Sequence, residues 1–402
     1  MNMKKILFLP FLQMRSGHHQ VAEALMDIVK KQTEGILVRK VDLISYANPS
    51  LEKMITSWYL KWIRYAPETY DHVYKKFFYS SSPTDHSFKW YYYFFLKKMD
   101  QLLIEEKPDL IVCTHGFPSY LVSQLKRKRK CDVPVINVYT DFFINNVWGR
   151  EEIDYHFLPS KDVKNEFSKK YQIQEQRMVV TGIPVHQEIT KNTKAKKTGD
   201  RPKILISGGN NGLGGIVKLL GKSKQSSQCD FYVLCGKNNK LFNEILSWQV
   251  DHIKPLPYIS SRVEMNNLYE EMDAIVTKPG GVTISEVLQK RLPVFVQSVL
   301  PGQEEINLQY LTKKGLVFKL KQKESFELGL LSILHDDTQM RLWEQSIQSF
   351  QNGMEMEGAE KIAEFLSGIL EQKSLKPSGQ FEQSKVYRLF RMRKSTSSEV
   401  GW

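Results

Sequence analysis

The 402-residue sequence is poor in cysteine and has no long apolar run. Its four cysteines are Cys113, Cys131, Cys229 and Cys235. They form no CxxC pair and no compact framework, which argues against a disulfide scaffold and suits core thiols in a reducing cytoplasm. No stretch approaches the roughly 20 apolar residues that span a bilayer. The short run at 6–12 contains Pro10 and lacks a small-residue cleavage site, which argues against a secretory signal.

Acidic residues are also in short supply, since 57 lysines and arginines face 44 aspartates and glutamates, a net charge of +13. Such a balance calls for an anionic partner, either nucleic acid or an anionic membrane surface. No RRM, KH, zinc-finger or helix-turn-helix signature supports nucleic acid. The cations cluster at 126–130, 191–203 and 373–394, where a solvated face, a linker and a disordered end are the simpler interpretations.

Short apolar or β-branched runs alternate with helical patterns along the whole chain, which predicts a parallel α/β architecture. Strands are expected at 5–9, 37–43, 110–114, 135–139, 155–158 and 178–181, and then at 203–207, 230–234, 253–255, 274–277, 294–297 and 317–320. After Gly17 the apolar residues recur with a period of 3.6, which indicates a helix.

The strands fall into two similar series, each starting with a strand that runs into a glycine-bearing turn. We therefore predict two Rossmann-like domains, at 1–190 and 203–371. The segment 191–202 is polar, lysine-rich and aperiodic, which is typical of a linker. Residues 372–402 are basic, with few core-forming side chains, and are expected to be a disordered tail.

Three loops of the second half follow predicted strands and resemble ligand loops, because open α/β sheets bind ligands beyond the carboxyl ends of their strands. The loop at 207–214 contains Gly208 and Gly209, which suit a phosphate or a plain tight turn. The loop at 277–286 could place a diphosphate at a helix start and a ribose on Glu286, although a glutamate near a helix start can simply complement the dipole. The loop at 301–307 offers amides and carboxylates to a polyhydroxylated ligand.

Four motifs, in this order, resemble one enzyme group. They are GHHQVAEAL (17–25), VYTDFFINNVW (138–148), VVTGIPVHQEI (179–189) and KPGGVTISEVLQKRLPVFVQSVLPGQEEIN (278–307). Together they are similar to the monogalactosyl- and diglucosyl-diacylglycerol synthase group, relatives of the MurG-type glycosyltransferases with the two-domain GT-B fold. The resemblance covers roughly residues 4–370 and implies an inverting transferase that uses a UDP-sugar and no bound metal or other cofactor.

The resemblance also implies roles for individual residues. Glu286 would hold the nucleotide ribose, and Ile259, in the segment PLPYI, would mark the backbone that binds uracil. His18, after Gly17, would act near the acceptor. The diphosphate would lie on the backbone amides of Gly280, Gly281, Val282 and Thr283. The sugar hydroxyls would be bound by the side chains of Gln303 and Glu304.

Two positions depart from the group's pattern. His186 stands where arginine usually follows Gly-Ile-Pro-Val, and arginine would be a permanent partner for the donor phosphates whereas histidine is only partly charged at neutral pH. In the N-terminal loop Arg15 stands where glycines are common, and it could in part replace the missing cation.

The stretch that contains His18 and His19 has three interpretations, namely a secretory signal, a metal site, or the first strand-turn-helix of an α/β enzyme with a histidine placed for chemistry. In the last case His19 is expected to be the structural neighbour of His18. A histidine in the first turn of a helix feels the positive end of the dipole, which biases it toward the neutral, base-competent form. This favours His18 as the base. Adjacent histidines do not share a helix face and no third ligand is near, so a zinc site is disfavoured. Asp141 is a second candidate for the base or for the group that orients His18, or it caps the next element.

Aromatic side chains crowd the segment 57–98, with lysines and arginines between them. Some must enter the core, but KWYYYFFLKK (89–98) has too many consecutive rings for one buried face. Such rings suit a membrane interface, or base stacking on nucleic acid. We favour the membrane because the donor motifs imply a lipid acceptor, and the run 126–130 and tail residues Lys385, Arg388 and Arg391 could add electrostatic attachment.

The sequence therefore predicts a cytoplasmic, peripheral enzyme at the inner face of the cell membrane. It would move a hexose from a UDP-sugar to diacylglycerol or a glycosyl-diacylglycerol. The alternatives are a non-catalytic nucleotide-sugar sensor or scaffold, and a transferase whose acceptor is polyprenyl-linked or a small molecule.

Overall fold

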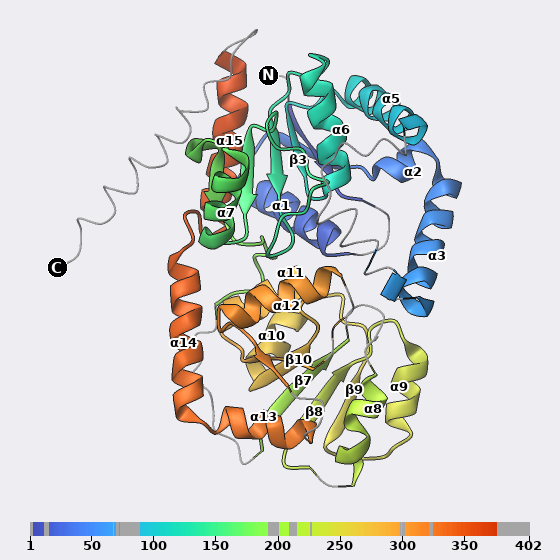
Figure 1. Cartoon of the computed structure of the whole chain (residues 1–402), viewed down its shortest axis with the longest axis vertical. Coiled ribbons are helices and arrows are strands. Elements are labelled where there is room, and N and C mark those ends of the chain that lie inside the picture. Colours follow the sequence, from blue (N-terminus) through green and yellow to red (C-terminus); the bar gives the residue numbers. More distant parts are fainter. Residues whose placement is uncertain are drawn as a thin grey trace, which may run out of the picture. The chain divides into compact units, whose positions relative to one another are not determined.

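The structure is a computed structural model that describes residues 3–11, 16–66, 68–69, 72, 89–191, 201–208, 215–225, 227–297, 299, 302–320 and 325–375. The chain divides into two compact units, one of residues Met1–Gln187 and Gly353–Trp402, the other of Glu188–Asn352. Each unit is built on one six-stranded parallel sheet flanked by helices (Figure 1). The predicted α/β class with two Rossmann-like domains is confirmed.

The sheet of the first unit has the order β2-β1-β3-β4-β5-β6. Its strands are β1 (Lys4–Leu9), β2 (Ile36–Lys40), β3 (Leu110–Cys113), β4 (Val135–Val138), β5 (Tyr155–Leu158) and β6 (Met178–Val180). Its helices are α1 (Gly17–Gln32), α2 (Leu43–Ala47), α3 (Pro49–Tyr65), α5 (Lys89–Glu106), α6 (Gly116–Arg127), α7 (Lys161–Tyr171) and α15 (Ala359–Leu375). The strands β3, β4 and β5 are buried throughout, as continuous apolar runs in a parallel sheet require.

One predicted strand of this unit ends early. The prediction placed a strand at 37–43, but β2 stops at Lys40 and α2 begins at Leu43. The cause is Asp42, whose Oδ1 accepts a hydrogen bond from the backbone N–H of Ser45 at 2.8 Å and so caps the helix.

The sheet of the second unit has the order β12-β11-β10-β7-β8-β9. Its strands are β7 (Lys203–Ser207), β8 (Asp230–Leu234), β9 (Ile253–Leu256), β10 (Ala274–Thr277), β11 (Val294–Val296) and β12 (Phe318–Lys319). Its helices are α8 (Ile216–Leu220), α9 (Asn239–Leu246), α10 (Arg262–Glu271), α11 (Gly281–Gln289), α12 (Gln303–Lys313), α13 (Phe326–Leu334) and α14 (Asp337–Asn352). Side chains such as Ile204, Phe231 and Phe295 form its apolar core.

The end of the chain corrects the predicted domain boundary. We expected residues up to 371 in the second domain, but the chain rejoins the first unit at Gly353. Glu355 bonds to the edge strand β6, accepting from the N–H of Val180 at 2.9 Å and donating its own N–H to the Val180 carbonyl at 2.8 Å. Its Oε1 also lies 2.6 Å from Lys164 Nζ, and the Phe365 ring packs edge-on against Tyr155.

The predicted tail and linker lie mostly beyond the described part of the chain. Helix α15 continues to Leu375, so the expected tail starts as helix, while 376–402 and its cations fall outside the described residues. The same holds for 192–200 of the predicted linker.

The strand orders locate where each sheet can bind a ligand. In the first sheet, successive strands are added on one side of β1 and then, from β3 on, on its other side. In the second sheet the same reversal of strand order occurs between β7 and β10. Open parallel sheets form a crevice at the carboxyl ends of the strands on either side of such a reversal. Ligand sites are therefore expected at the loops that follow β1 and β3 and at those that follow β7 and β10.

A buried ion pair in the second unit gives a first stability prediction. Lys290 is 1% exposed and its Nζ lies 2.8 Å from Glu270 Oε1. Glu270→Leu would leave this ammonium buried without its partner. We therefore expect the free energy of unfolding, measured in urea, to fall by about 3–5 kcal/mol. The double variant Glu270→Leu/Lys290→Met should recover most of that loss, since it removes both charges. A single variant as stable as the wild type would contradict the prediction.

Candidate active site

His18 lies where three strand ends of the first unit meet. It is the second residue of α1, which follows β1. Its Nδ1 is 2.9 Å from the carbonyl oxygen of Thr114 and 2.8 Å from Oγ1 of Thr140. Thr114 follows β3 and Thr140 follows β4. The side chain thus lies at the reversal point between β1 and β3.

These contacts determine which ring nitrogen of His18 is free. A carbonyl oxygen can only accept, so the contact with Thr114 requires the proton on Nδ1 and leaves a lone pair on Nε2. Burial lowers the pKa of His18 from 6.5 to about 4; the Thr114 hydrogen bond opposes this and the nearby His19 adds to it. At neutral pH the ring is therefore neutral and can accept a proton at Nε2. Loss of solvent is the main cause of this low pKa. The contribution that we expected from the helix dipole stays a prediction.

A second histidine that the sequence argument missed lies beside it. His115 caps α6, accepting the N–H of Phe117 at its Nδ1 over 3.1 Å. Its ring stacks on Phe11 with centroids 4.4 Å apart and meets His18 edge-on at 4.6 Å. Burial, with the neighbouring histidines, holds the pKa of His115 well below its ordinary value. Its position directly after a buried strand at the sheet reversal is the signal that could have found it.

The other first-unit candidates have distinct places. His19 is 7% exposed and faces the core, which fits the structural role expected for it. Asp141, which we expected either to be the base or to orient His18, follows Thr140 in the chain. The contacts given at His18 Nδ1 come from Thr114 and Thr140. Gly17 opens α1. Arg15 lies outside the described residues.

The low pKa of His18 can be measured directly. An NMR titration of labelled histidine should show its midpoint near pH 4 rather than 6.5. The unfolded chain then binds more protons than the folded chain between these values, so folding stability should fall as pH drops from 6.5 toward 4. A midpoint near 6.5 would show that the ring is solvated and would contradict the environment described.

The second unit offers free backbone donors where a phosphate was predicted. Helix α11 starts at Gly281, and the carbonyl of Gly280 accepts its first hydrogen bond from Ile284 N–H at 3.0 Å. By helix geometry the N–H groups of Gly281, Val282 and Thr283 have no intrahelical acceptor. A Cβ placed on Gly280 would meet nothing within 4 Å, so the space above this helix start is open. Together with the dipole, the three donors can bind an anion.

Glu286 lies farther along α11, in its second turn. It is 5% exposed, and Tyr269 of α10 donates a hydrogen bond to its Oε2 at 3.0 Å while Arg262 Nη1 lies 3.8 Å from Oε1. Burial raises the pKa of Glu286, and Arg262 and Tyr269 oppose that rise. Because a dipole interaction fades beyond the first turn, complementing the helix does not explain this carboxyl.

The remaining predicted donor residues also follow strands of the second sheet. Gly208 follows β7, and Ile259 lies in the half-buried segment after β9. Gln303 and Glu304 open α12 behind Gly302, whose φ of 89° favours glycine. Gly209 lies outside the described residues. These predicted positions, like the start of α11, lie beyond the carboxyl ends of parallel strands.

Comparison with known proteins gives the family. The family model described as monogalactosyldiacylglycerol (MGDG) synthase matches residues 18–185. The chain is 38% identical to the uncharacterized glycosyltransferase YkoN of Bacillus subtilis over 371 residues, 92% of this chain and 98% of YkoN. It is 30% identical to the processive diacylglycerol beta-glucosyltransferase of Bacillus cereus, covering 83% of this chain and 87% of that enzyme. The chain belongs to the diacylglycerol glycosyltransferase family.

The solved structures agree with this transferase fold. MurG of Acinetobacter baumannii superposes with a TM-score of 0.54 at 14% identity, covering 87% of this chain and 96% of MurG. At that identity the likeness shows the fold alone. The predicted GT-B architecture and the resemblance to this family are both confirmed.

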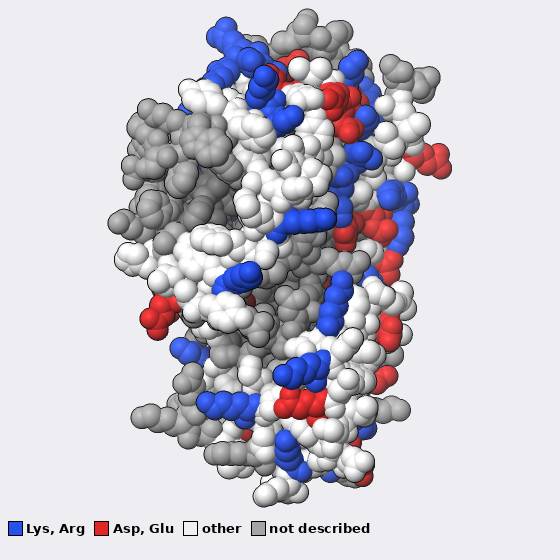
Figure 2. Space-filling view, turned by 90° about the vertical axis from the view of Figure 1, so that its right-hand side faces the viewer, with Lys and Arg blue, Asp and Glu red and all other residues white. Residues whose placement is uncertain are grey.

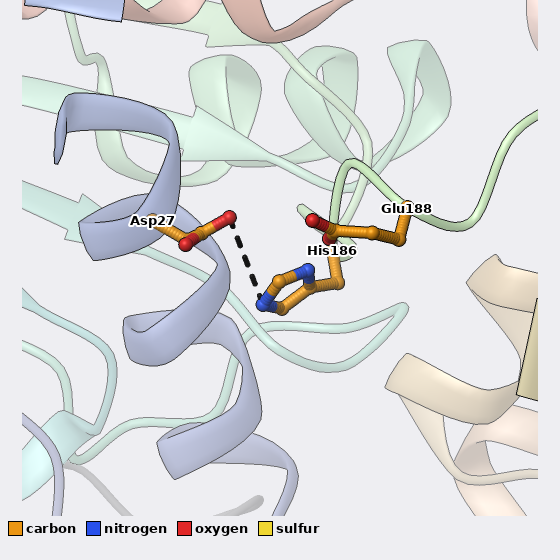
Figure 3. A group of neighbouring side chains, drawn as sticks. All are labelled: Asp27, His186 and Glu188. Atoms are coloured by element: carbon orange, nitrogen blue, oxygen red, sulfur yellow. Dashed lines mark ion pairs between the residues drawn. The ribbon is translucent and has the colours of Figure 1, made fainter. Parts of the chain in front are cut away.

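His186 is the family departure noted in the sequence, and within the first unit it faces α1. Its Nε2 lies 3.9 Å from Oδ2 of Asp27 (Figure 3). Gln187 donates a hydrogen bond to the same oxygen at 2.8 Å. Burial alone would raise the pKa of Asp27, but the hydrogen bonds from Gln187 and Lys31 and the nearby His186 hold it below its ordinary value. Asp27 and His186 are potential metal ligands of the first unit, whereas Glu188, the third potential ligand, belongs to the second unit.

The aromatic helix α5 divides its rings between core and surface, as predicted for KWYYYFFLKK. Phe95 is fully buried, whereas Tyr93 is 61% and Phe94 38% exposed. Lys128 extends over the rings of Tyr92 and Tyr93, at 5.9 and 5.7 Å from their centroids. No described helix is both long and apolar enough to cross a bilayer.

The basic run 126–130 is less available to an anionic surface than its sequence suggests. Lys126 pairs with Asp154 at 2.6 Å, Arg127 with Glu152 at 2.5 Å, and Lys130 with Asp100 at 3.2 Å. On the face drawn in Figure 2, Lys and Arg side chains are spread out rather than gathered into one field. These pairs lower the net positive charge that the run presents to an anionic surface.

Proposed function

We propose that this transferase moves a hexose, with inversion, from a UDP-sugar to the hydroxyl of a lipid acceptor, diacylglycerol or a glycosyl-diacylglycerol. The observation that carries the proposal is the His18 ring, held at Nδ1 by Thr114 and neutral, with Nε2 left as a base. The B. cereus relative, named as a processive diacylglycerol beta-glucosyltransferase, supports the choice of acceptor.

In the proposed reaction each site has one task. His18 Nε2 accepts the proton of the acceptor hydroxyl while its oxygen forms a bond to the anomeric carbon. The bond from that carbon to the diphosphate breaks, and its electron pair leaves on UDP. Thr114, bonded to Nδ1–H, stabilises the imidazolium that forms, as a carboxylate does in a catalytic triad.

The second unit would hold the donor. The N–H groups of residues 281–283 and the dipole of α11 would bind the diphosphate and stabilise the charge that develops as UDP leaves. Glu286 would accept the ribose hydroxyls, and Gln303 and Glu304 would bind the hexose. In this proposal backbone donors do the work that a divalent cation does elsewhere, so no metal is required.

The proposal is tested by incubating the purified protein with diacylglycerol vesicles and a panel of radiolabelled UDP-sugars. We expect label in the lipid extract with at least one donor, and release of one UDP per sugar transferred. Release of UDP without labelled lipid would refute the lipid acceptor. With neither product from any donor, the enzyme assignment would be wrong and a nucleotide-sugar sensor would be favoured.

A lipid acceptor requires contact with a membrane surface, and the exposed rings of α5 are one group of the first unit that can provide it. Aromatic rings settle at the lipid interface. Tyr93→Ser/Phe94→Ser should reduce co-sedimentation with anionic vesicles severalfold, with UDP affinity unchanged. Leu246→Ser, an exposed apolar residue of the second unit (56% exposed), is the matched control and should bind vesicles as the wild type does. Equal binding by all three proteins would contradict the prediction.

A further inference from the structure

The pair of histidines at the end of β1 and β3 carries a further inference, which rests on the proposed function. His115 approaches His18 edge-on, with ring centroids 4.6 Å apart. Both side chains are partly exposed, and neither Nε2 is among the buried atoms without a partner. By contrast, the Nε2 of the buried His156 is such an atom. Both residues of the pair therefore keep part of their surface exposed, where a ligand can reach them.

The local contacts give the two rings opposite tautomers. His18 donates from Nδ1 to a carbonyl, so its Nε2 carries a lone pair. His115 accepts a backbone N–H at Nδ1, so in the neutral ring its proton lies on Nε2. One ring thus offers an acceptor at Nε2, and its neighbour, which is in edge contact with it, offers a donor. This arrangement matches an alcohol whose adjacent carbon bears a second oxygen.

We propose that His115 binds the acceptor through its Nε2–H, donating to the oxygen on the carbon next to the reacting hydroxyl. In diacylglycerol that oxygen belongs to the neighbouring ester, and in a glycosyl-diacylglycerol it is the adjacent sugar hydroxyl. His115 keeps its proton throughout, while the proton of the reacting hydroxyl goes to His18. The stack on Phe11 and the cap to Phe117 fix the His115 ring for this contact. The pair would therefore select acceptors with two neighbouring oxygens over simple alcohols.

The tautomers are tested first, without any need for turnover. Long-range proton–nitrogen NMR of the histidine-labelled protein should show His18 protonated at Nδ1 and His115 at Nε2. Short-chain diacylglycerol should then shift the Nε2 signal of His115 and leave that of His156, the buried control, in place. The reverse tautomer at His115, or no shift on adding the acceptor, overturns the proposal even if the protein is inactive.

Turnover gives the second test. His115→Asn keeps a side-chain oxygen that can cap α6 but removes the Nε2–H, so the fold and UDP binding should be preserved. We expect kcat/KM for diacylglycerol to fall about three- to tenfold more than kcat/KM for a long-chain alkanol. This difference corresponds to the loss of one neutral hydrogen bond. Equal losses for both acceptors would assign His115 a merely structural role. A wild type that transfers to neither acceptor refutes the proposed function, while the NMR result still decides the binding role.

Discussion

Replacing His18 with alanine is expected to lower kcat by about 10²–10⁴-fold, the usual contribution of a positioned general base. The affinity for UDP should stay unchanged, because His18 belongs to the first unit and the predicted nucleotide residues belong to the second. Single-turnover transfer and calorimetric binding of UDP measure the two quantities separately. Full transfer activity in this variant would refute the base assignment.

A second substitution separates proton transfer from packing at the same position. His18→Asn retains an amide N–H that can donate to the Thr114 carbonyl, as His18 Nδ1 does over 2.9 Å. It offers no basic nitrogen. We expect His18→Asn to melt like the wild type and to be as slow as His18→Ala. If it recovered most of the activity, His18 would orient its surroundings rather than accept a proton.

Glu286→Gln is expected to weaken UDP binding by about 10- to 100-fold. The carboxylate is proposed to accept two ribose hydroxyls, and hydrogen bonds to a charged group contribute about 1.5–3 kcal/mol. Glutamine keeps an oxygen for the Tyr269 hydroxyl, which lies 3.0 Å from Glu286 Oε2. Because glutamine has nearly the same shape as glutamate and keeps this contact, we expect the fold to be preserved. The loss can then be assigned to the nucleotide.

The ribose role can be distinguished from a general loss of affinity. The wild type should bind UDP more tightly than its 2′-deoxy analogue, and Glu286→Gln should bind the two nearly alike. Glu304→Gln is the matched control, since its proposed partner is the hexose, and it should leave UDP affinity unchanged. An undiminished preference for UDP in Glu286→Gln would remove Glu286 from the ribose site.

Local patterns were sufficient to predict most of the fold. Runs such as 110–114 and 274–277 are apolar up to a final threonine and lie between polar turns, as expected of a buried parallel strand. The errors arose where a single contact ended or redirected an element. Asp42 ended β2 early by capping α2, and Glu355 tied the end of the chain to β6 of the first unit. Neither contact leaves a periodic pattern.

The candidate site was less predictable because it depends on which strands are neighbours. His18 could be named from its place after a glycine at a helix start. Its partners Thr114 and Thr140 lie 96 and 122 positions away along the chain, and only the order β1-β3-β4 brings them to its ring. His115 was missed for the same reason. A motif can therefore indicate a base, but the group that fixes its tautomer follows from the sheet topology.

Mass spectrometry of the lipid product tests the account most directly. Wild type and His18→Asn would each be incubated with diacylglycerol vesicles and UDP-glucose, UDP-galactose or UDP-N-acetylglucosamine. We expect a hexosylated diacylglycerol from the wild type with at least one donor, and at least 100-fold less from His18→Asn. Equal product from both proteins, or none from the wild type with any donor, would contradict this expectation.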